Sequence, residues 1–403
     1  MTTESLSLPK EIKDSYALVI ENQIFQQLCQ QWKSASFLAI DTEFIRTTTF
    51  YPHVGLIQIN DGTANTLIDP LTISEWGPFC ELLQDKEIVK IMHSCSEDLQ
   101  VFMTAMEIVP EPVFDTQIAA GLLNEGFGCS YQTLVKNILD VDLPKGETRS
   151  DWLQRPLSGN QCHYAALDVA CLPAIYQHQK SALEQSDRLS WLEEECELLT
   201  AQYREELAGD YSDYFLNFRG AWQLNKEELG VLRQLAQWRE LRARKRDKPR
   251  NWIVKDKQLV EIAKLRPGNL EALQEIDDLG NNFLRHEGEE IIQEVKHALA
   301  IPDEILPELL PKPLDGKDKQ RLKKGQQFAE QKAEEMGLPT EMLIRKRWLV
   351  SLLQNMRDQA PRNLEKAPGN DSENVSEKNA AADFLPVELT GWREPLLLPE
   401  LIE

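Results

Sequence analysis

The strongest constraint on the fold of this chain is a set of four carboxylates and one phenol in three short segments that lie far apart in the sequence: Asp41, Glu43, Asp98, Tyr164 and Asp168. The first two directly follow the apolar run 37–40. If that run is a strand, both carboxylates point to the same face of the sheet, because side chains alternate along a strand with a period of two. The pair is then able to share cations.

The other three positions have the pattern of helices. Asp98 follows a serine-rich segment typical of a helix start, while Tyr164 and Asp168 stand four residues apart and so project from one helix face. Three distant elements can therefore converge on one acidic site. Four carboxylates in one site repel each other unless divalent cations neutralise them, and two magnesium-class ions are the expected occupants.

These motifs resemble those of the DEDD exonuclease superfamily, in its tyrosine-bearing branch, and within that branch the ribonuclease D family. Residues 114–120 (FDTQIAA) and 145–157 (KGETRSDWLQRPL) also read like ribonuclease D segments, and the resemblance covers roughly residues 15 to 300 with a weaker echo beyond. It implies an α/β ribonuclease H-like exonuclease domain followed by one or two all-α helical modules.

The resemblance also implies a role for each site residue. Asp41, Glu43 and Asp168 would hold one cation, Asp41 and Asp98 would hold the second partly through water, and Tyr164 would place the attacking water. Each position has a simpler structural reading: a solvated strand end, a helix-surface hydrogen bond, or an acid that complements a helix dipole. One converged site explains all of the positions together, so we favour it. His93 and His163 are interpreted as structural. Asp115 is a candidate cap of a helix that starts near Thr116, and Arg149 and Arg155 have two alternative partners, a phosphate or Asp151.

Net charge argues against a nucleic-acid enzyme, because a balance of -22 should repel a polyanion. The net charge of the whole chain does not reflect one basic region. Residues 233–257 contain ten lysines or arginines against three acids, a local balance of +7. We expect RNA phosphates to contact the centre of this region, although a solvated face is the alternative reading. The predicted RNA-binding residues are Arg244, Lys245, Arg246, Lys248 and Arg250.

The chain is long enough for two or three domains. We expect the exonuclease domain at 1–210, with strands at 37–40, 55–60 and 65–68 as an antiparallel meander, an apolar run at 88–92 and a connecting helix at 193–209. Residues 211–300 resemble a helicase-and-ribonuclease-D C-terminal (HRDC) domain. A proline-rich linker at 301–318 precedes a second, degenerate HRDC-like domain at 319–403, which is interrupted by a polar segment at 367–382.

The predicted function is divalent-metal-dependent removal of nucleotides from RNA 3' ends, with release of 5'-monophosphates. The resemblance implies tRNA precursors with 3' extensions as the partner RNA and a monomeric enzyme. Two alternatives stay open: a DNA-directed 3'-5' exonuclease, and a non-catalytic RNA-binding protein on a nuclease fold, against which the intact carboxylates weigh. The sequence shows neither a membrane span nor a signal peptide, so we expect a cytoplasmic protein.

Overall fold

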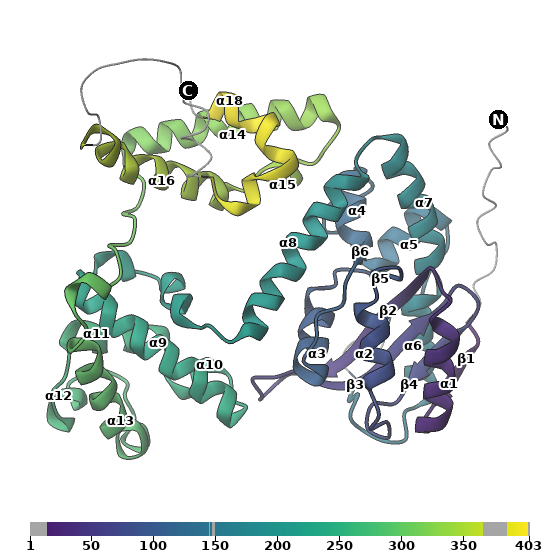
Figure 1. The fold of residues 1–403 in the computed structure, drawn as a ribbon, viewed down its shortest axis with the longest axis horizontal. Helices are drawn as coiled ribbons and strands as arrows, with labels where there is room; N and C mark the ends of the chain where they lie inside the picture. Colours follow the sequence, from purple (N-terminus) through teal and green to yellow (C-terminus); the bar gives the residue numbers. More distant parts are fainter. Residues whose placement is uncertain (1–13, 145, 147–149, 366–384, 402–403) are drawn as a thin grey trace.

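The computed structural model describes residues 14–144, 146, 150–365 and 385–401. An α/β domain occupies one side of the molecule, and helix α8 (Leu189–Ala208) leads out of it to two groups of helices (Figure 1). The predicted order of an α/β domain followed by all-α helices is confirmed. None of the helices within the described ranges is long and apolar enough to cross a bilayer.

A six-stranded mixed sheet forms the centre of the α/β domain, in the order β1-β4-β3-β2-β5-β6. The antiparallel meander predicted for β2, β3 and β4 is confirmed, and the apolar run near residue 90 is β5, parallel to β2. The two outer strands, of four and three residues, were not predicted. The strands are β1 (Tyr16–Val19), β2 (Phe37–Ile45), β3 (His53–Asn60), β4 (Asn65–Ile68), β5 (Val89–Met92) and β6 (Val113–Asp115).

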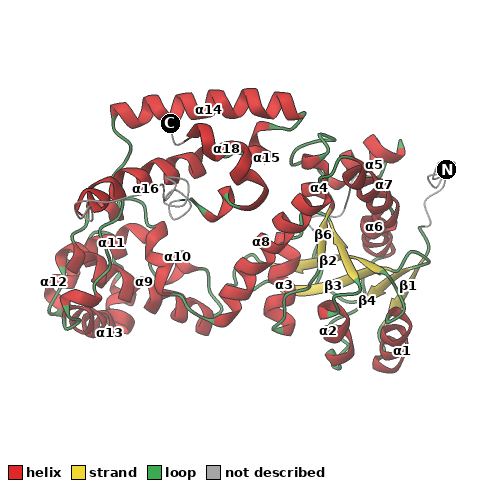
Figure 2. Ribbon diagram, turned by 45° about the horizontal axis from the view of Figure 1, so that its top comes forward, coloured by secondary structure: helices red, strands yellow, loops and turns green. Residues whose placement is uncertain are grey.

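Helices flank the sheet on both sides (Figure 2). One face is covered by α6 (Gly159–Ala170), whose Ala165 and Ala166 pack against Leu56 of β3, and this is the face to which Asp41 of β2 also points. The other helices of the domain are α1 (Asn22–Trp32), α2 (Gly77–Gln84), α3 (Ser96–Met106), α4 (Thr116–Leu122), α5 (Tyr131–Leu139) and α7 (Leu172–Gln185).

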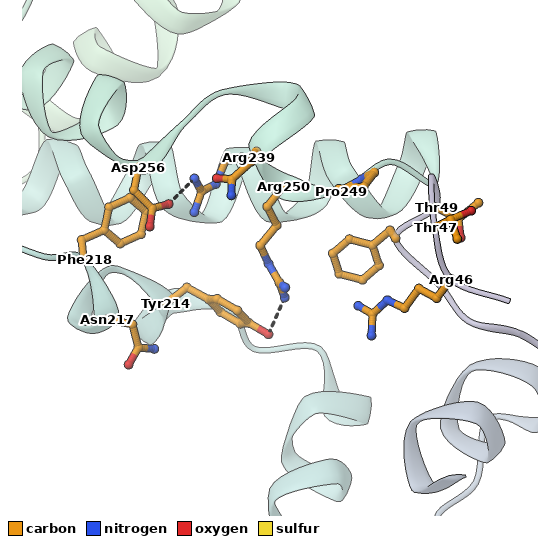
Figure 3. Close-up of a pocket in the computed structure, with 12 residues that line it drawn as sticks. Arg46, Thr47, Thr49, Tyr214, Asn217, Phe218, Arg239, Pro249, Arg250 and Asp256 are labelled. Atoms are coloured by element: carbon orange, nitrogen blue, oxygen red, sulfur yellow. Dashed lines mark hydrogen bonds and ion pairs between the residues drawn. The ribbon is translucent and has the colours of Figure 1, made fainter. Parts of the chain in front are cut away.

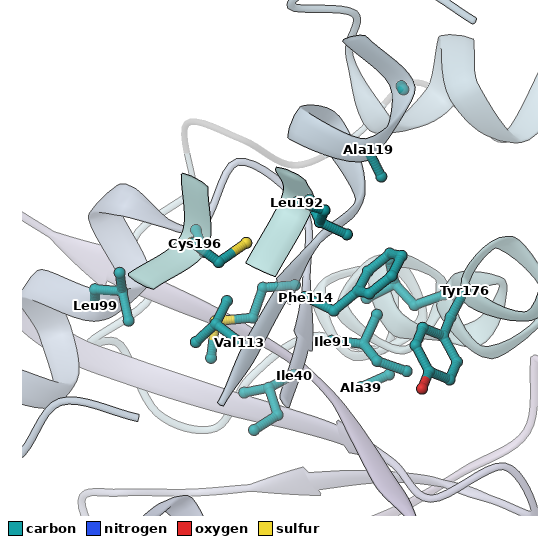
Figure 4. Packing of buried hydrophobic residues seen from close by; sticks show 14 of the residues in the cluster. Ala39, Ile40, Ile91, Leu99, Val113, Phe114, Ala119, Tyr176, Leu192 and Cys196 are labelled. Carbon is teal, nitrogen blue, oxygen red and sulfur yellow. The ribbon is translucent and has the colours of Figure 1, made fainter. Parts of the chain in front are cut away.

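Helix α8 belongs to the core of the α/β domain as well as connecting it to the next helices. Its Leu192 and Cys196 are buried and lie over Val113 and Phe114 of β6 (Figure 4). The helix predicted at 193–209 is thus confirmed, and it ends at Gly209, whose φ of 82° suits a left-handed helix cap. Because the first half of α8 is packed on the sheet, the position from which the chain continues into the following helices is fixed relative to the α/β domain.

The helices beyond α8 form two groups with the same plan. The first contains α9 (Lys226–Arg246), α10 (Arg250–Ile253), α11 (Asp256–Leu265), α12 (Leu270–Gln274) and α13 (Asn281–Leu299), and the second contains α14 (Gly316–Met336), α15 (Thr340–Leu343), α16 (Lys346–Glu365) and α18 (Glu394–Leu401). Helices α14, α15 and α16 start 90 residues after α9, α10 and α11. Equivalent buried pairs are Leu232 and Leu322, Ala243 and Ala333, and Leu259 and Leu349.

Short 3-10 helices fill the connections: η1 (Ser212–Asn217), η2 (Ala221–Gln223), η3 (Asp303–Ile305), η4 (Val387–Leu389) and η5 (Gly391–Arg393). The predicted linker 301–318 contains η3, but α14 already begins at Gly316, where Asp315 caps it with a capping box. The predicted polar segment 367–382 lies outside the described residues.

The second group of helices packs directly on the α/β domain. The Trp191 ring of α8 stacks on Trp392 with 4.4 Å between ring centroids, and buried Arg393 donates a 2.7 Å hydrogen bond to the Met342 carbonyl oxygen. Gly121 of α4 leaves the space for Met342, because an added Cβ would lie 2.6 Å from the Met342 sulfur. Apolar contacts therefore join the C-terminal helices and the sheet in one core.

Candidate active site

Strand β2 presents Asp41 and Glu43 on the face covered by α6. In the register with β3, Asp41 lies opposite Gln58 and Glu43 lies opposite Leu56, so the two carboxylates are on one face as predicted. The register shifts immediately after Glu43, which marks a β-bulge or irregularity. Bulges are common next to active sites because they re-aim the side chains at a strand end.

Helix α6 supplies Tyr164 and Asp168 from above that face. Its first turn is fixed by a capping box in which Ser158 accepts from the Gln161 amide. Its last turn is held by buried Tyr131, whose hydroxyl donates to the Leu167 carbonyl oxygen over 3.1 Å. Both ends of the helix are thus restrained, which gives the side chains at 164 and 168 fixed positions over β2.

Three of the four predicted metal ligands meet at one point. One carboxylate oxygen from each of Asp41, Glu43 and Asp168 lies within 4.8 Å of the other two. Asp98, in the first turn of α3, accepts a 2.5 Å hydrogen bond from the Thr42 hydroxyl, and Thr42 stands between Asp41 and Glu43 in β2. The sequence-based prediction did not include Thr42. Its position between Asp41 and Glu43 was the feature of the sequence that could have identified it as part of the site.

Mutual repulsion dominates the electrostatics of this cluster. Burial, and then the charge of Asp168, raise the pKa of Asp41 well above its usual range. Burial and the three aspartates raise the pKa of Glu43 to about 10. The pKa of Asp168 rises to about 7, because burial and Asp98 outweigh the hydrogen bond from Tyr164. Burial and the charge of Asp41 raise the pKa of Asp98, although the Thr42 hydrogen bond opposes this.

The cluster fits divalent cations by the chemistry of its donors. All its ligand atoms are carboxylate oxygens, which are the hard ligands that Mg²⁺ and Mn²⁺ prefer. A bound cation would relieve the repulsion that raises these pKa values. Tyr164 stays a neutral phenol here, since burial and the charge of Asp168 raise its pKa further above the usual value of 10. It can therefore donate a hydrogen bond but does not serve as a base at neutral pH.

The three arginines predicted to contact RNA have carboxylate partners within the protein. Arg244 donates to Glu206 over 2.6 Å and to Glu240 over 2.8 Å, and Arg250 donates to both oxygens of Glu240. Glu240 is only 1% exposed, so these pairs are structural. Arg246 pairs with Glu287, Lys248 reaches the Thr48 carbonyl oxygen, and Lys245 is exposed. Phosphate contact by these five residues stays a prediction.

Neighbouring residues considered in the sequence have structural contacts. Asp115 caps α4 by accepting from the Gln117 and Ile118 amides, as proposed for it. Arg155 was expected to meet phosphate or Asp151, but both its Nε and Nη2 donate to Asp69, at 2.6 and 2.7 Å. His93 lies between Thr116 and the Cys129 carbonyl oxygen, and His163 is exposed. Arg149 lies outside the described residues.

The fold and the acidic cluster define the class of protein. Residues 16–184 match the family model described as 3'-5' exonuclease, and this stretch contains the whole sheet and all five predicted catalytic residues. Residues 228–295, which run from α9 to α13, match the model of the HRDC domain.

Comparison with whole proteins narrows this class to one family. A ribonuclease D of Pseudomonas paraeruginosa is 40% identical over 338 residues, which cover 84% of this chain and 89% of the relative. A ribonuclease D of Serratia proteamaculans is 36% identical over 395 residues, covering 96% and 98%. The crystal structure of Escherichia coli RNase D, an exoribonuclease involved in structured RNA processing, matches with a TM-score of 0.80 and 31% identity, covering 96% of this chain and 98% of that one. The chain belongs to the ribonuclease D family, and it is a 3'-5' exoribonuclease.

Proposed function

We propose that this enzyme hydrolyses phosphodiester bonds at RNA 3' ends with two divalent cations, Mg²⁺ or Mn²⁺, and releases 5'-monophosphates. The observation that carries the proposal is the meeting of Asp41, Glu43 and Asp168 oxygens within 4.8 Å. These three residues would hold one cation, and Asp41 with Asp98 would hold the other. When bound, such ions activate water and stabilise the leaving oxygen.

The protein's own groups have separable tasks in this mechanism. Thr42 orients Asp98 through its 2.5 Å hydrogen bond. Tyr164 is neutral and lies one helical turn from Asp168, so its hydroxyl is available to orient the attacking water. The restrained ends of α6 preserve this geometry during turnover.

We further propose tRNA precursors with 3' extensions as the substrate, a monomeric enzyme in the cytoplasm, and a domain division at 1–210, 211–300, 301–318 and 319–403.

The 90-residue repeat of α9–α11 in α14–α16 supports a second, degenerate HRDC-like module. The equivalent helix end of that module differs in charge, because Arg244, Lys245 and Arg246 in the last turn of α9 correspond to Glu334, Glu335 and Met336 in the last turn of α14. We therefore assign RNA contacts to the first module.

The direct test incubates a 3'-extended tRNA, and separately a single-stranded DNA of matched length, with Mg²⁺ or Mn²⁺ and with a chelator. Asp41→Asn keeps the side-chain shape and removes the charge. It should slow shortening of the RNA more than about a hundredfold, since even outer-shell changes at metal sites cost about ten- to a hundredfold. The matched control Asp142→Asn, at a side chain that is 84% exposed, should leave the rate unchanged.

The outcomes separate the candidate functions. Metal-dependent stepwise shortening of RNA, with much slower shortening of DNA, supports the proposal. Equal shortening of DNA would assign the enzyme to DNA as well. RNA binding without shortening of either substrate would indicate a binding protein on a nuclease fold and would overturn the proposal.

A further inference from the structure

A cavity of about 520 Å³ lies where the α/β domain meets the first group of helices. Figure 3 shows Arg46 approaching it from the α/β domain, with Tyr214, Asn217 and Arg250 on the opposite side. The walls come from the loop after β2, from η1 and the residue after it, and from the first helical module, where the start of α10 is joined by Arg239 of α9 and Asp256 of α11. None of the five proposed catalytic residues lines the cavity, so it is a separate site.

The cavity is nevertheless close to the acidic cluster. Arg46 follows Glu43 by three residues in an extended segment, a spacing of about 10 Å between their Cα atoms. Its Nη1 donates a 2.5 Å hydrogen bond to Gln100, which is on α3 two residues after Asp98. The Arg46–Gln100 pair therefore joins the two elements that carry Glu43 and Asp98, and the cavity opens beside this pair.

The lining groups match the chemistry of single-stranded RNA. Arg46 is exposed, and its partner Gln100 is a neutral amide, so the positive charge is retained in a chain whose net charge is -22. The Tyr214 ring is held in place by Arg250, whose Nη2 lies 3.2 Å from the tyrosine hydroxyl. Asn217 adds an exposed amide. Guanidinium groups contact phosphates, aromatic rings stack on bases, and amides read base edges.

We propose that this cavity binds the single-stranded RNA just upstream of the 3'-terminal nucleotide, with a phosphate at Arg46 and a base against the ring of Tyr214. The inference rests on the proposed function, because it assumes that the acidic cluster receives an RNA 3' end. In this arrangement, the junction between the α/β domain and the first helical module binds the part of the RNA that is not being cut. Substrates too short to reach the cavity should then lose this contribution.

The test uses the full chain and two variants from opposite walls, Arg46→Glu and Asn217→Glu. Both side chains are exposed, so the substitutions should not disturb folding. Arg285→Glu is the matched control, because Arg285 is also exposed and also pairs with a neutral amide, that of Asn282, on α13. Each protein is assayed on a dinucleotide and on an unstructured RNA of about ten nucleotides, within the usual size of single-strand binding sites.

Binding is measured separately with the longer RNA on each variant combined with Asp41→Asn, so that cleavage is negligible during the measurement. We expect Arg46→Glu and Asn217→Glu to raise Kd and KM for the longer RNA at least about tenfold, and to leave kcat and the dinucleotide reaction unchanged. Arg46→Glu should also reduce the dependence of log Kd on log salt by about one. Arg285→Glu should behave as the parent.

Two results would overturn the inference. Unchanged Kd and KM for the longer RNA in both variants would show that the cavity holds no RNA. Equal losses on the dinucleotide and the longer RNA would show that Arg46 acts at the cleavage site. Failure of the parent enzyme to shorten either RNA would instead count against the proposed function, while the binding measurement would still decide whether the cavity contacts RNA.

Discussion

Asp247, at the end of α9, accepts 2.9 Å hydrogen bonds from the backbone amides of Phe50 and Tyr51 in the loop between β2 and β3. This joins the α/β domain to the first helical module across 196 and 197 residues of sequence. Burial opposes ionisation of Asp247, but the two amides and His53 outweigh it and lower the pKa of this carboxyl. The contact also fixes the loop that bounds the RNA-binding cavity proposed above.

Asp247→Ala should therefore loosen the junction. It removes the acceptor of two amides and places alanine at a φ of 48°, so we expect a loss of about 1–3 kcal/mol in the free energy of unfolding. Asp247→Asn is the control, because asparagine tolerates this backbone conformation and keeps an acceptor oxygen. Urea unfolding of the full chain measures the difference, and equal stability of the alanine variant and the parent would contradict the prediction.

The acidic cluster should make the metal-free protein less stable as pH rises. The folded-state pKa of Asp168, about 7, lies above its unfolded value, so the folded chain binds more protons between about pH 4 and pH 7. The free energy of unfolding should then fall across this window by more than about 1.4 kcal/mol, the equivalent of one pKa unit.

Thermal unfolding in chelator at several pH values measures this decline. Asp168→Asn should flatten it, and saturating Mg²⁺ or Mn²⁺ should abolish it, because the cations compete with the protons. A pH slope that is the same in the parent and in Asp168→Asn would mean that repulsion in the cluster does not govern stability.

The basic region should divide into structural and RNA-contacting residues. Arg250→Ala removes a partner of the buried Glu240 carboxylate, so we expect a loss of about 3 kcal/mol in stability. Lys245→Ala changes an exposed side chain and should alter stability by less than about 0.5 kcal/mol while reducing RNA affinity. Chemical denaturation and RNA titration of both variants decide this, and a stable Arg250→Ala protein would refute the structural role.

Gln58 should be a site where substitution increases stability. Its side chain is fully buried opposite Asp41, and within the described residues neither its oxygen nor its nitrogen has a hydrogen-bond partner. Gln58→Met should raise the free energy of unfolding by about 1 kcal/mol or more. The control is Asn60 on the same strand, whose Nδ2 donates to Asn65 over 2.7 Å, and Asn60→Leu should destabilise. Lower stability of Gln58→Met in calorimetry would indicate an unrecognised partner for the amide.

Local sequence patterns predicted the elements of the site well. The period of two in 37–43 placed Asp41 and Glu43 on one face, and the i, i+4 spacing placed Tyr164 and Asp168 on one helix, as the structure has them. The partner of Arg155 could not be predicted from local patterns. Arg155 pairs with Asp69, which is 86 residues away in the sequence, and no local pattern favours Asp69 over Asp151, which is only a few residues from Arg155.

The sequence by itself determined the chemistry of this protein, because the identity and local spacing of its acidic residues depend on strand and helix periods alone. It also determined the α/β and helical order, through the apolar runs and their breaks. Only the tertiary structure decided which charges remain available: Glu240 engages Arg244 and Arg250, whereas Arg46 faces a neutral amide beside a cavity. Such pairings depend on three-dimensional packing between distant segments, so they cannot be predicted by counting charges along the chain.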